Sequence, residues 1–530
     1  RRADQPAEKM STRIGIDVGG TNTDAVLMDG ERVLGEVKTP TTADVTSGIV
    51  TALRKLVADS RVQPSRVMAV MIGTTHFTNA VVEAKRLMPT AAIRLGLPAT
   101  QALPPMVDWP PRLKEAIGNH TYLCHGGHEF DGRLISKLDP HELRGVAEDI
   151  GKKGIRSIAI SSVFSPVNAE MELEAARVFE GQLPGVMVSL SHEIGRIGLL
   201  ERENATIMNA CLRDLAVHIV EAFDSALRQV GIKAPVYLSQ NDGTLMSVDY
   251  AERYPVATFA SGPTNSMRGA AFLSGRLDCA VVDIGGTTSD VGVLQQGFPR
   301  EASVTVEIGQ VRTNFRMPDV LSFGLGGGSL VRANGELRIG PDSVGYELTS
   351  KALIFGGEIL TATDIAVAAG RAEIGDPRTV RHLKRQLIQR AVALIEESIS
   401  QAVDRMKTSA DPIPLVVVGG GSILLGDRLA GASELVKPSH FAVANAIGAA
   451  IAQVGGEVDR IFALDQMGRE AALEQAKQEA VEKAVAAGAR EETVNIVDVE
   501  EVPLAYLPSN AARIRVKAIG ELALEAESVV

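Results

Sequence analysis

The sequence is poor in the residues that mark several classes of protein. Its 530 residues include only three cysteines, Cys124, Cys211 and Cys279. They stand at no paired spacing, which argues against a disulfide framework, a zinc knuckle or an iron–sulfur motif. Acidic residues outnumber basic ones by 65 to 54, and the net charge of −11 offers no electrostatic footprint for nucleic acid or an anionic membrane.

Long apolar runs are also missing. Residues 442–454 come nearest to a membrane span, but they are too few and include Asn445 and Gln453. The first ten residues are polar and lack the apolar region of a signal peptide, so we expect residues 1–10 to be a disordered extension. Together these features predict a cytoplasmic protein.

What the sequence does contain is one glycine-rich phrase that occurs twice. Residues 17–24 read Asp-Val-Gly-Gly-Thr-Asn-Thr-Asp, and residues 283–290 read Asp-Ile-Gly-Gly-Thr-Thr-Ser-Asp. Each copy follows a run of β-forming residues and leads into another, which predicts a β-hairpin with a Gly-Gly-Thr turn. A repeat in the same context indicates a duplicated architecture.

The residue types in this phrase suit a triphosphate. Glycine lets backbone amides approach an anion, threonine adds hydroxyl donors, and aspartate can hold hydrated Mg²⁺. We therefore predict that the two hairpins bind ATP from both sides, with Asp17 and Asp283 as catalytic residues that hold Mg²⁺ through water. The predicted phosphate-binding residues are Gly19, Gly20, Thr21, Thr23, Gly285, Gly286, Thr287 and Thr288.

A third glycine-rich element supports the ATP hypothesis. Residues 414–418 form a buried-strand pattern that stops at Gly419, Gly420, Gly421 and Ser422. We predict that this loop lies against the adenine or ribose, although a plain strand-to-helix turn would have the same sequence. In their order along the chain, the three elements resemble the two phosphate motifs and the adenosine motif of the actin/sugar-kinase/heat-shock ATPase superfold.

Strand and helix patterns alternate through most of the chain, which predicts an α/β fold. The resemblance implies a two-lobed, actin-like ATPase with a duplicated ribonuclease H-like core. We expect an N-terminal lobe at 11–232, a C-terminal lobe at 233–455 and a small α+β module at 456–530. Residues 89–140, with their Pro-Pro pairs and many glycines, are predicted to be an irregular surface excursion.

An ordered set of motifs resembles the A-type subunit of the hydantoinase/oxoprolinase family over about residues 13–453. The set comprises both hairpin phrases, Gly73-Thr74-Thr75, Ser261-Gly262-Pro263, Gly326-Gly327-Gly328-Ser329, Thr361-Ala362-Thr363-Asp364 and Ala444-Asn445-Ala446-Ile447-Gly448. The resemblance implies that ATP hydrolysis drives ring opening of a cyclic amide or imide, such as a hydantoin, 5-oxoproline or a related lactam. It also implies a B-type partner subunit that holds the hydrolytic or metal site.

Other functions stay open from the sequence alone. An ATP-dependent carboxylase subunit of the same family, a small-molecule kinase and a non-enzymatic ATP switch would all use the same hairpins. For the substrate side we favour Thr74, Thr75 and His76, which follow a predicted buried strand at 67–72.

One short cluster suggests a metal site. His125 and His128 lie beside Cys124 and Glu129, and zinc accepts these ligand types. No further ligand pair follows at a recognisable spacing. We therefore interpret the two histidines as surface residues and leave metal binding open.

Overall fold

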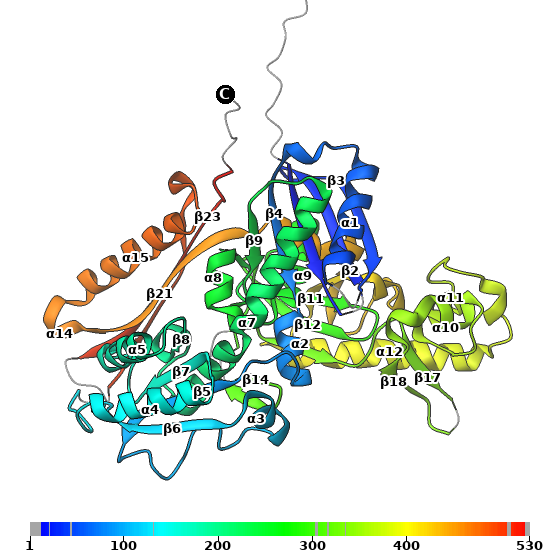
Figure 1. The fold of residues 1–530 in the computed structure, drawn as a ribbon. Helices are drawn as coiled ribbons and strands as arrows, with labels where there is room; N and C mark the ends of the chain where they lie inside the picture. Colours follow the sequence, from blue (N-terminus) through cyan, green and yellow to red (C-terminus); the bar gives the residue numbers. More distant parts are fainter. Residues whose placement is uncertain are drawn as a thin grey trace, which may run out of the picture.

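The computed structural model describes residues 12–20, 22–42, 45–130, 132–302, 306–314, 317–333, 335–505 and 510–524. The extension predicted at residues 1–10 lies outside these ranges. Within them the strands form three main sheets, and helices cover the sheet faces (Figure 1). The α/β class predicted from the sequence is confirmed.

The first lobe is built on a nine-stranded sheet with the order β22–β23–β21–β10–β9–β4–β1–β2–β3. Its first hairpin is antiparallel, whereas β4 runs parallel to β1 and β9 runs parallel to β4. The bounds are β1 Thr12–Val18, β2 Asn22–Asp29, β3 Arg32–Pro40, β4 Val67–Thr74, β9 Val236–Ser239, β10 Thr244–Ser247, β21 Gln453–Ala463, β22 Asn495–Pro503 and β23 Ala511–Gly520.

The second lobe repeats the first lobe's arrangement on a smaller sheet. Its hairpin pairs with a parallel strand, β19, on one side and with the antiparallel strand β16 on the other. In both hairpins the aspartates face each other in register, Asp17 opposite Asp24 and Asp283 opposite Asp290. This duplication is the two-lobed core predicted from the repeated phrase. The bounds are β11 Cys279–Ile284, β12 Ser289–Gln295, β13 Phe298–Pro299, β16 Val320–Phe323, β19 Ile413–Val418 and β20 Ala432–Val436.

The prediction of an irregular excursion at residues 89–140 was wrong. This segment contributes two strands to a four-stranded parallel sheet with the order β6–β5–β7–β8. Its β5 strand is buried almost throughout, and Arg94 on it pairs with Glu203 of α7 in the interior. The Pro-Pro pairs lie between strands and not within them, so their turn signals hid the βα pattern. The bounds are β5 Thr90–Leu97, β6 His120–His125, β7 Ser157–Ser162 and β8 Met187–Leu190.

Helices and a few short strands complete the two lobes and the four-stranded sheet. The first lobe and the four-stranded sheet carry α1 Val45–Ser60, α2 His76–Glu83, α3 Pro111–Ile117, α4 Pro140–Lys152, α5 Glu170–Gln182, α6 Ser191–Ile194, α7 Leu199–Val230 and α8 Val248–Arg253. The second lobe carries α10 Leu348–Lys351, α11 Ala362–Ala368 and α12 Arg385–Met406, together with the small strands β17 Ser329–Arg332 and β18 Arg338–Ser343. Two further short strands, β14 Val306–Ile308 and β15 Val311–Thr313, pair near α7. No helix in the described ranges combines the length and apolar character needed to cross a membrane.

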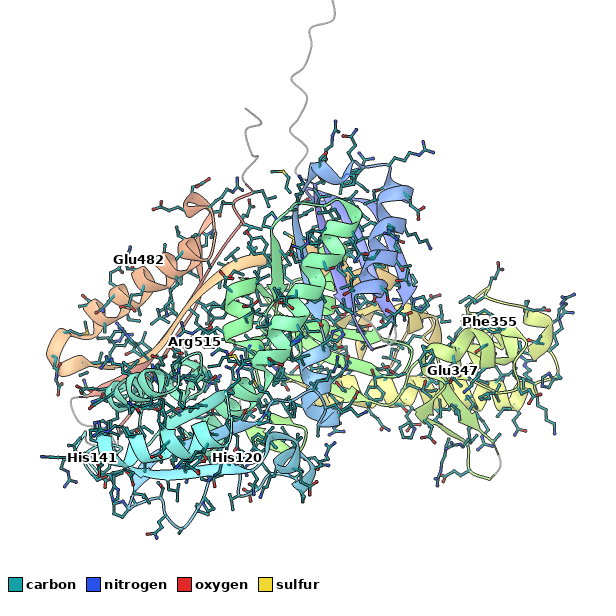
Figure 2. All side chains as sticks on the ribbon, in the orientation of Figure 1. His120, His141, Glu347, Phe355, Glu482 and Arg515 are labelled. Carbon is teal, nitrogen blue, oxygen red and sulfur yellow. The ribbon has the colours of Figure 1, made fainter. Side chains whose placement is uncertain are left out.

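The C-terminal residues continue the first lobe's sheet. The boundary predicted between residues 455 and 456 falls inside β21, which pairs with β10 on one side and β23 on the other. Helices α14 Leu464–Met467 and α15 Arg469–Ala486 lie along this extension (Figure 1). Arg515 on β23, labelled in Figure 2, pairs with Glu301 of the second half of the chain and with Asp498 of β22. The predicted limit at 456 therefore falls within a strand, whereas the limit at 233 falls between α7 and β9, a strand that joins the first lobe's sheet.

Two small-residue helices cross between the lobes with backbone against backbone. They are α9, Ser261–Ser274, and α13, Ala444–Ala450. A Cβ on Gly269 would lie 1.9 Å from the carbonyl oxygen of Ala444, and one on Gly448 would lie 1.8 Å from that of Asn265. Only glycine allows this approach. The crossing also packs on β1, β2 and β4 through α13 and on β11, β12 and β19 through α9.

Replacing Gly448 by alanine should destabilise the protein. The added methyl group meets backbone and not a movable side chain, so we expect a loss of about 3 kcal/mol in the free energy of unfolding. Gly145→Ala is the matched control, because this helical glycine of α4 has open space around it and alanine should add up to about 1 kcal/mol there. Chemical denaturation of both variants checks this, and equal stabilities would contradict the close crossing.

Candidate active site

The first hairpin holds a buried carboxylate at the end of β1. Asp17 is 5% exposed. Asn445 of α13 donates from Nδ2 to Asp17 Oδ2 at 3.0 Å and to Asp24 Oδ2 at 2.9 Å. The other oxygen, Asp17 Oδ1, is buried and accepts no hydrogen bond from the described residues. It lies against Gly73, where a Cβ would come within 2.5 Å of it.

Burial shifts the ionisation of this group. Desolvation, together with the neighbouring carboxylates of Asp24 and Asp283, raises the pKa of Asp17 to about 7, although Asn445 and Lys38 act in the opposite direction. The site therefore gathers more negative charge than the protein compensates. A cation beside Asp17 Oδ1 would compensate this excess of negative charge.

The second hairpin presents its aspartate in the equivalent position. Asp283 accepts a hydrogen bond of 2.5 Å from Ser266 Oγ of α9. Burial raises its pKa, although Ser266 and Lys38 lower it. Its partner across the hairpin, Asp290, accepts from Ser322, and burial raises the pKa of Asp290 to about 6.

Lys38 of β3 connects the two lobes at the edge of the site. Its ammonium group donates to both oxygens of Asp24, at 2.8 and 2.9 Å, and to the carbonyl oxygen of Ala442 at 3.0 Å. Gly420 lies close to the same side chain. The roles of Lys38, Asn445 and Ser266 were not predicted from the sequence. Only Asn445 carried a signal, because it belongs to one of the motifs on which the resemblance to the hydantoinase/oxoprolinase family rests.

The loop at Gly326–Ser329 lies against the turn of the second hairpin. The amide of Gly327 donates to the carbonyl of Gly285 at 3.0 Å, and that of Gly328 donates to Gly286 at 2.7 Å. A Cβ on Gly326 would lie 2.6 Å from the backbone at Gly286. The loop therefore packs directly on the turn of the second hairpin.

The glycine loop after β19 also packs on the second hairpin. Gly419 adopts a positive φ of 86°, and a Cβ there would lie 2.2 Å from Asp283 Oδ1. Gly421 lies against the carbonyl of Gly285. The Ser422 hydroxyl is buried and donates to the carbonyl of Gly419 at 2.6 Å, so in this structure it braces its own loop.

The threonines predicted to bind phosphate differ in solvent exposure. Thr21 lies outside the described residues. Thr23 is 1% exposed, and its hydroxyl shares a hydrogen bond of 3.4 Å with that of Thr41. In the second hairpin Thr288 is exposed, and its carbonyl accepts from the amide of Gly285.

The residues favoured for the substrate side follow β4 directly. The amide and hydroxyl of Thr75 reach the carbonyl of Val18, beside the first hairpin, at 3.3 and 3.4 Å. His76 Nδ1 lies 2.5 Å from the Thr74 hydroxyl, and burial lowers the pKa of this histidine to about 4. His76 therefore carries a neutral imidazole, on the segment that follows β4 beside the first hairpin.

The two histidines of the suspected metal cluster differ in solvent exposure. His125 is exposed and its Nδ1 pairs with Glu142 at 3.1 Å. The interpretation of His128 as a surface residue was wrong, because it is 4% exposed and lies 3.4 Å from Asn168. Within the described residues, no three His, Cys, Asp or Glu side chains form a metal-binding group.

The hairpin site suits Mg²⁺ held through water and phosphate. Such an ion needs one or two carboxylates and keeps several waters. Asp17 Oδ1 is a buried acceptor without a partner among the described residues, and the missing side chain of Gly73 leaves room beside it. Asp17 and Asp283 are therefore the residues that would hold the ion.

Comparison with known families agrees with these motifs. The profile described as the hydantoinase/oxoprolinase N-terminal region matches residues 13–183, and the hydantoinase/oxoprolinase profile matches residues 202–376. The chain belongs to the hydantoinase/oxoprolinase family. The first match covers Asp17, and the second covers Asp283 and the loop at Gly326–Ser329.

Curated relatives in this hydantoinase/oxoprolinase family include proteins of different activity. Caprolactamase subunit alpha of Pseudomonas jessenii is 26% identical over 83% of this chain and 66% of its own length. Acetophenone carboxylase gamma subunit of Aromatoleum aromaticum is 27% identical over 67% of this chain and 53% of its own length. The chain thus spans about half to two thirds of the length of these two relatives.

Solved structures show the same fold. The ATP-dependent caprolactamase from Pseudomonas jessenii superposes with a TM-score of 0.77 at 19% identity, covering 96% of this chain and 88% of that one. The nucleotide-free acetone carboxylase gives 0.67 at 17% identity, covering 97% and 88%. Both agree with the two-lobed architecture predicted from the duplicated hairpin.

Neutralising Asp17 should stabilise the protein at high pH. The raised pKa means that the folded state binds more protons than the unfolded state between about pH 4 and 7, so stability falls as the pH rises through this window. At pH 8 the metal-free Asp17→Asn variant should gain on the order of 2 kcal/mol over the wild type, and at pH 4 almost nothing. Thermal melts at both pH values check this. A variant that is less stable at pH 8 would contradict the charge excess.

Proposed function

We propose that this chain is the ATP-hydrolysing subunit of an enzyme that opens a cyclic amide or imide ring. One observation carries the proposal: the two Asp-x-Gly-Gly-Thr hairpins flank the α9–α13 crossing, and one of their buried aspartates has an oxygen without a partner in the described residues. The family and the relative named caprolactamase support the substrate class.

A chemical reason explains the use of ATP. An unstrained amide is a poor electrophile. Transfer of the γ-phosphoryl group to the carbonyl oxygen breaks the bond to ADP and forms an imidate-type phosphate. Water then attacks the ring carbon and the C–N bond breaks, which leaves an acyl phosphate on the opened chain. A second water hydrolyses this acyl phosphate, so the products are the open amino acid, ADP and phosphate.

The residues of this chain would position that transfer. Phosphoryl transfer asks a protein mainly for alignment and charge neutralisation. The amides of Gly20 and Gly286 would bind the phosphates, because those of Gly19 and Gly285 donate to carbonyls within their own hairpins. Asp17 and Asp283 would hold Mg²⁺, whose charge offsets that of the phosphates. Thr75 and His76 would lie on the side of the acceptor, next to the first hairpin.

Replacing Asp283 by alanine should abolish ATP hydrolysis, with a loss of at least about a hundredfold, because the residue serves the metal and not the core. The melting temperature should stay within a few degrees of the wild type. Asp404→Ala is the control, since this aspartate of α12 has a side chain that is 72% exposed. Normal hydrolysis by the Asp283 variant would show that the second hairpin has another role.

We further propose that ring opening needs a second subunit. The motifs found here account for ATP handling, and relatives are named as subunits. A B-type hydrolase subunit in the cytoplasm is the partner that we expect. The purified chain with ATP, Mg²⁺ and a panel of hydantoins, 5-oxoproline and larger lactams should give ADP without a ring-opened product. Stoichiometric ring opening by the chain alone would overturn this prediction.

Carboxylation is the second candidate, because one curated relative and one structural neighbour are named as carboxylases. In that case ATP would activate bicarbonate or an enolate. Labelled bicarbonate separates the two functions when the chain is assayed with its partner: label in an acid-stable product supports carboxylation, and its absence together with ring-opened product supports the amidohydrolase.

A further inference from the structure

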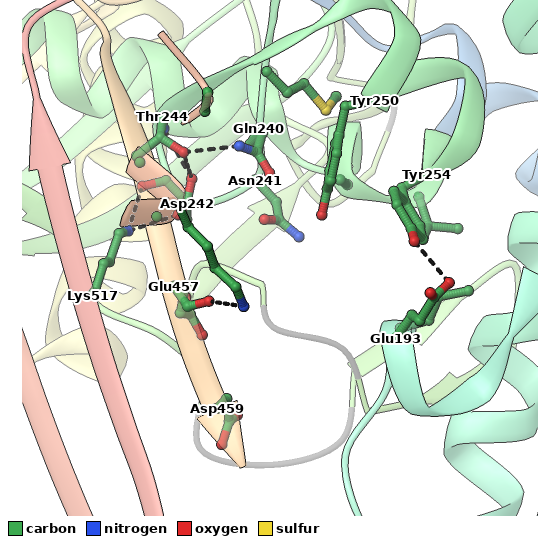
Figure 3. Close-up of a pocket in the computed structure, with 18 of the residues that line it drawn as sticks. Glu193, Gln240, Asn241, Asp242, Thr244, Tyr250, Tyr254, Glu457, Asp459 and Lys517 are labelled. Carbon is green, nitrogen blue, oxygen red and sulfur yellow. Dashed lines mark hydrogen bonds and ion pairs between the residues drawn. The ribbon is translucent and has the colours of Figure 1, made fainter. Parts of the chain in front are cut away.

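A second cavity lies away from the two hairpins. Its volume is about 800 Å³, and α6, the β9–β10 turn, α8, the start of β21 and the end of α15 enclose it (Figure 3). Strand β10 lies three strand spacings from β1, or about 14 Å. Cavities of this size hold small organic ligands.

A histidine oriented by a buried carboxylate lines this cavity. His192 Nδ1 lies 2.7 Å from Glu172 Oε2, and its backbone amide donates to the same oxygen at 3.1 Å. The other oxygen of Glu172 accepts from the amide of Ser162 and from the hydroxyl of Ser191. Burial alone would raise the pKa of Glu172, but these bonds lower it overall, so the carboxylate stays ionised. The proton of a neutral His192 is thereby fixed on Nδ1.

The second ring nitrogen of His192 is consequently an acceptor. His192 Nε2 makes no hydrogen bond to any residue that the structure describes, and the residue is part of the cavity wall. A hydrogen-bond acceptor with a fixed tautomer on the wall of a cavity suits a ligand that carries an N–H or O–H group.

Tyr250 supplies a donor to the same cavity. Figure 3 shows its hydroxyl pointing into the space. This hydroxyl makes no hydrogen bond within the described ranges, and burial, followed by the charges of Asp242, Glu193 and Glu457, raises its pKa. The phenol therefore remains protonated and can donate to a carbonyl oxygen. Its ring is held by Tyr254, with the two ring centroids 4.6 Å apart.

The charged groups of the wall are paired within the protein. Glu193 accepts from the Tyr254 hydroxyl at 2.7 Å and from Arg253 at 3.0 Å. Asp242 pairs with Lys517 at 2.8 Å, and Lys483 donates to the carbonyl of Glu457 at 2.8 Å. Asp459 and Glu457 are likewise paired, with Arg513 and Arg515. Because the carboxylates of the wall are already engaged by charged groups of the protein, the cavity favours a neutral molecule over a cation.

We propose that this cavity binds a small neutral cyclic amide, whose N–H donates to His192 and whose carbonyl accepts from Tyr250. A lactam presents both an N–H donor and a carbonyl acceptor, which match a ring-nitrogen acceptor on His192 and the hydroxyl donor of Tyr250. The choice of lactams as ligands rests on the proposed function. The cavity lies too far from the hairpins for phosphoryl transfer, so it is a binding site, separate from the acceptor position near Thr75 and His76.

Ligand-observed NMR titrations of the whole chain, without ATP or Mg²⁺, test this site. The probes are ε-caprolactam and 2-pyrrolidone, their N-methyl derivatives, which lack the N–H donor, and 5-oxoproline, which adds a carboxylate. The parent lactams should bind, and methylation or the added carboxylate should weaken binding about fivefold or more. Tyr250→Phe and His192→Ala should each weaken lactam binding by a similar factor. Tyr346→Phe and His218→Ala are the controls, because both residues are exposed and lie elsewhere.

The outcomes separate this site from the proposed function. Lactam binding that responds to Tyr250→Phe supports the site even where ATP hydrolysis is absent. No lactam binding, or binding unchanged in the Tyr250 and His192 variants, overturns the site and leaves the hairpin ATPase standing. If His192→Ala does not fold, Tyr250→Phe decides the question, because this tyrosine is 46% exposed and the change removes one oxygen atom.

Discussion

The close crossing of α9 and α13 is the constraint on which the site depends. Gly448 brings α13 against the carbonyl of Asn265, and Gly269 brings α9 against that of Ala444. The residues next to these contact points bind the two aspartates: Ser266 donates to Asp283, and Asn445 donates to Asp17. Any separation of the helices would move both carboxylates. Asp17 and Asp283 are held near enough to affect each other electrostatically because their hydrogen-bond donors share this contact.

The second organising feature is an excess of buried negative charge. Burial raises the pKa values of Asp17, Asp24 and Asp283. The charge of Asp24 raises those of Asp17 and Asp283 further, whereas the Lys38 ammonium group lowers all three. Such an arrangement is unfavourable for the protein alone and becomes favourable when a divalent ion binds. The protein therefore gives up stability at the site that its proposed ligand restores, a pattern typical of functional sites.

Much of this could be predicted from the sequence, for identifiable reasons. The duplicated hairpin was readable because Asp, Gly-Gly and Thr stand at the same spacing in both copies, and local turn chemistry fixes their structure. The four-stranded sheet was hidden because Pro-Pro pairs interrupt the segment between β5 and β6. Lys38 and Ser266 gave no signal, because their importance comes from contacts across long stretches of chain. The same is true of Glu172 and His192, which lie 20 residues apart and meet only in the fold.

The central claim is that Mg²⁺–ATP binds between the two hairpins. A crystal structure with a non-hydrolysable ATP analogue and Mn²⁺, located by its anomalous scattering, tests it most directly. We expect the Mn²⁺ between the phosphates and the carboxylates of Asp17 and Asp283, at the water-mediated distance of about 4 Å. A metal and triphosphate bound elsewhere, or bound in the cleft with neither carboxylate near the ion, would contradict the account.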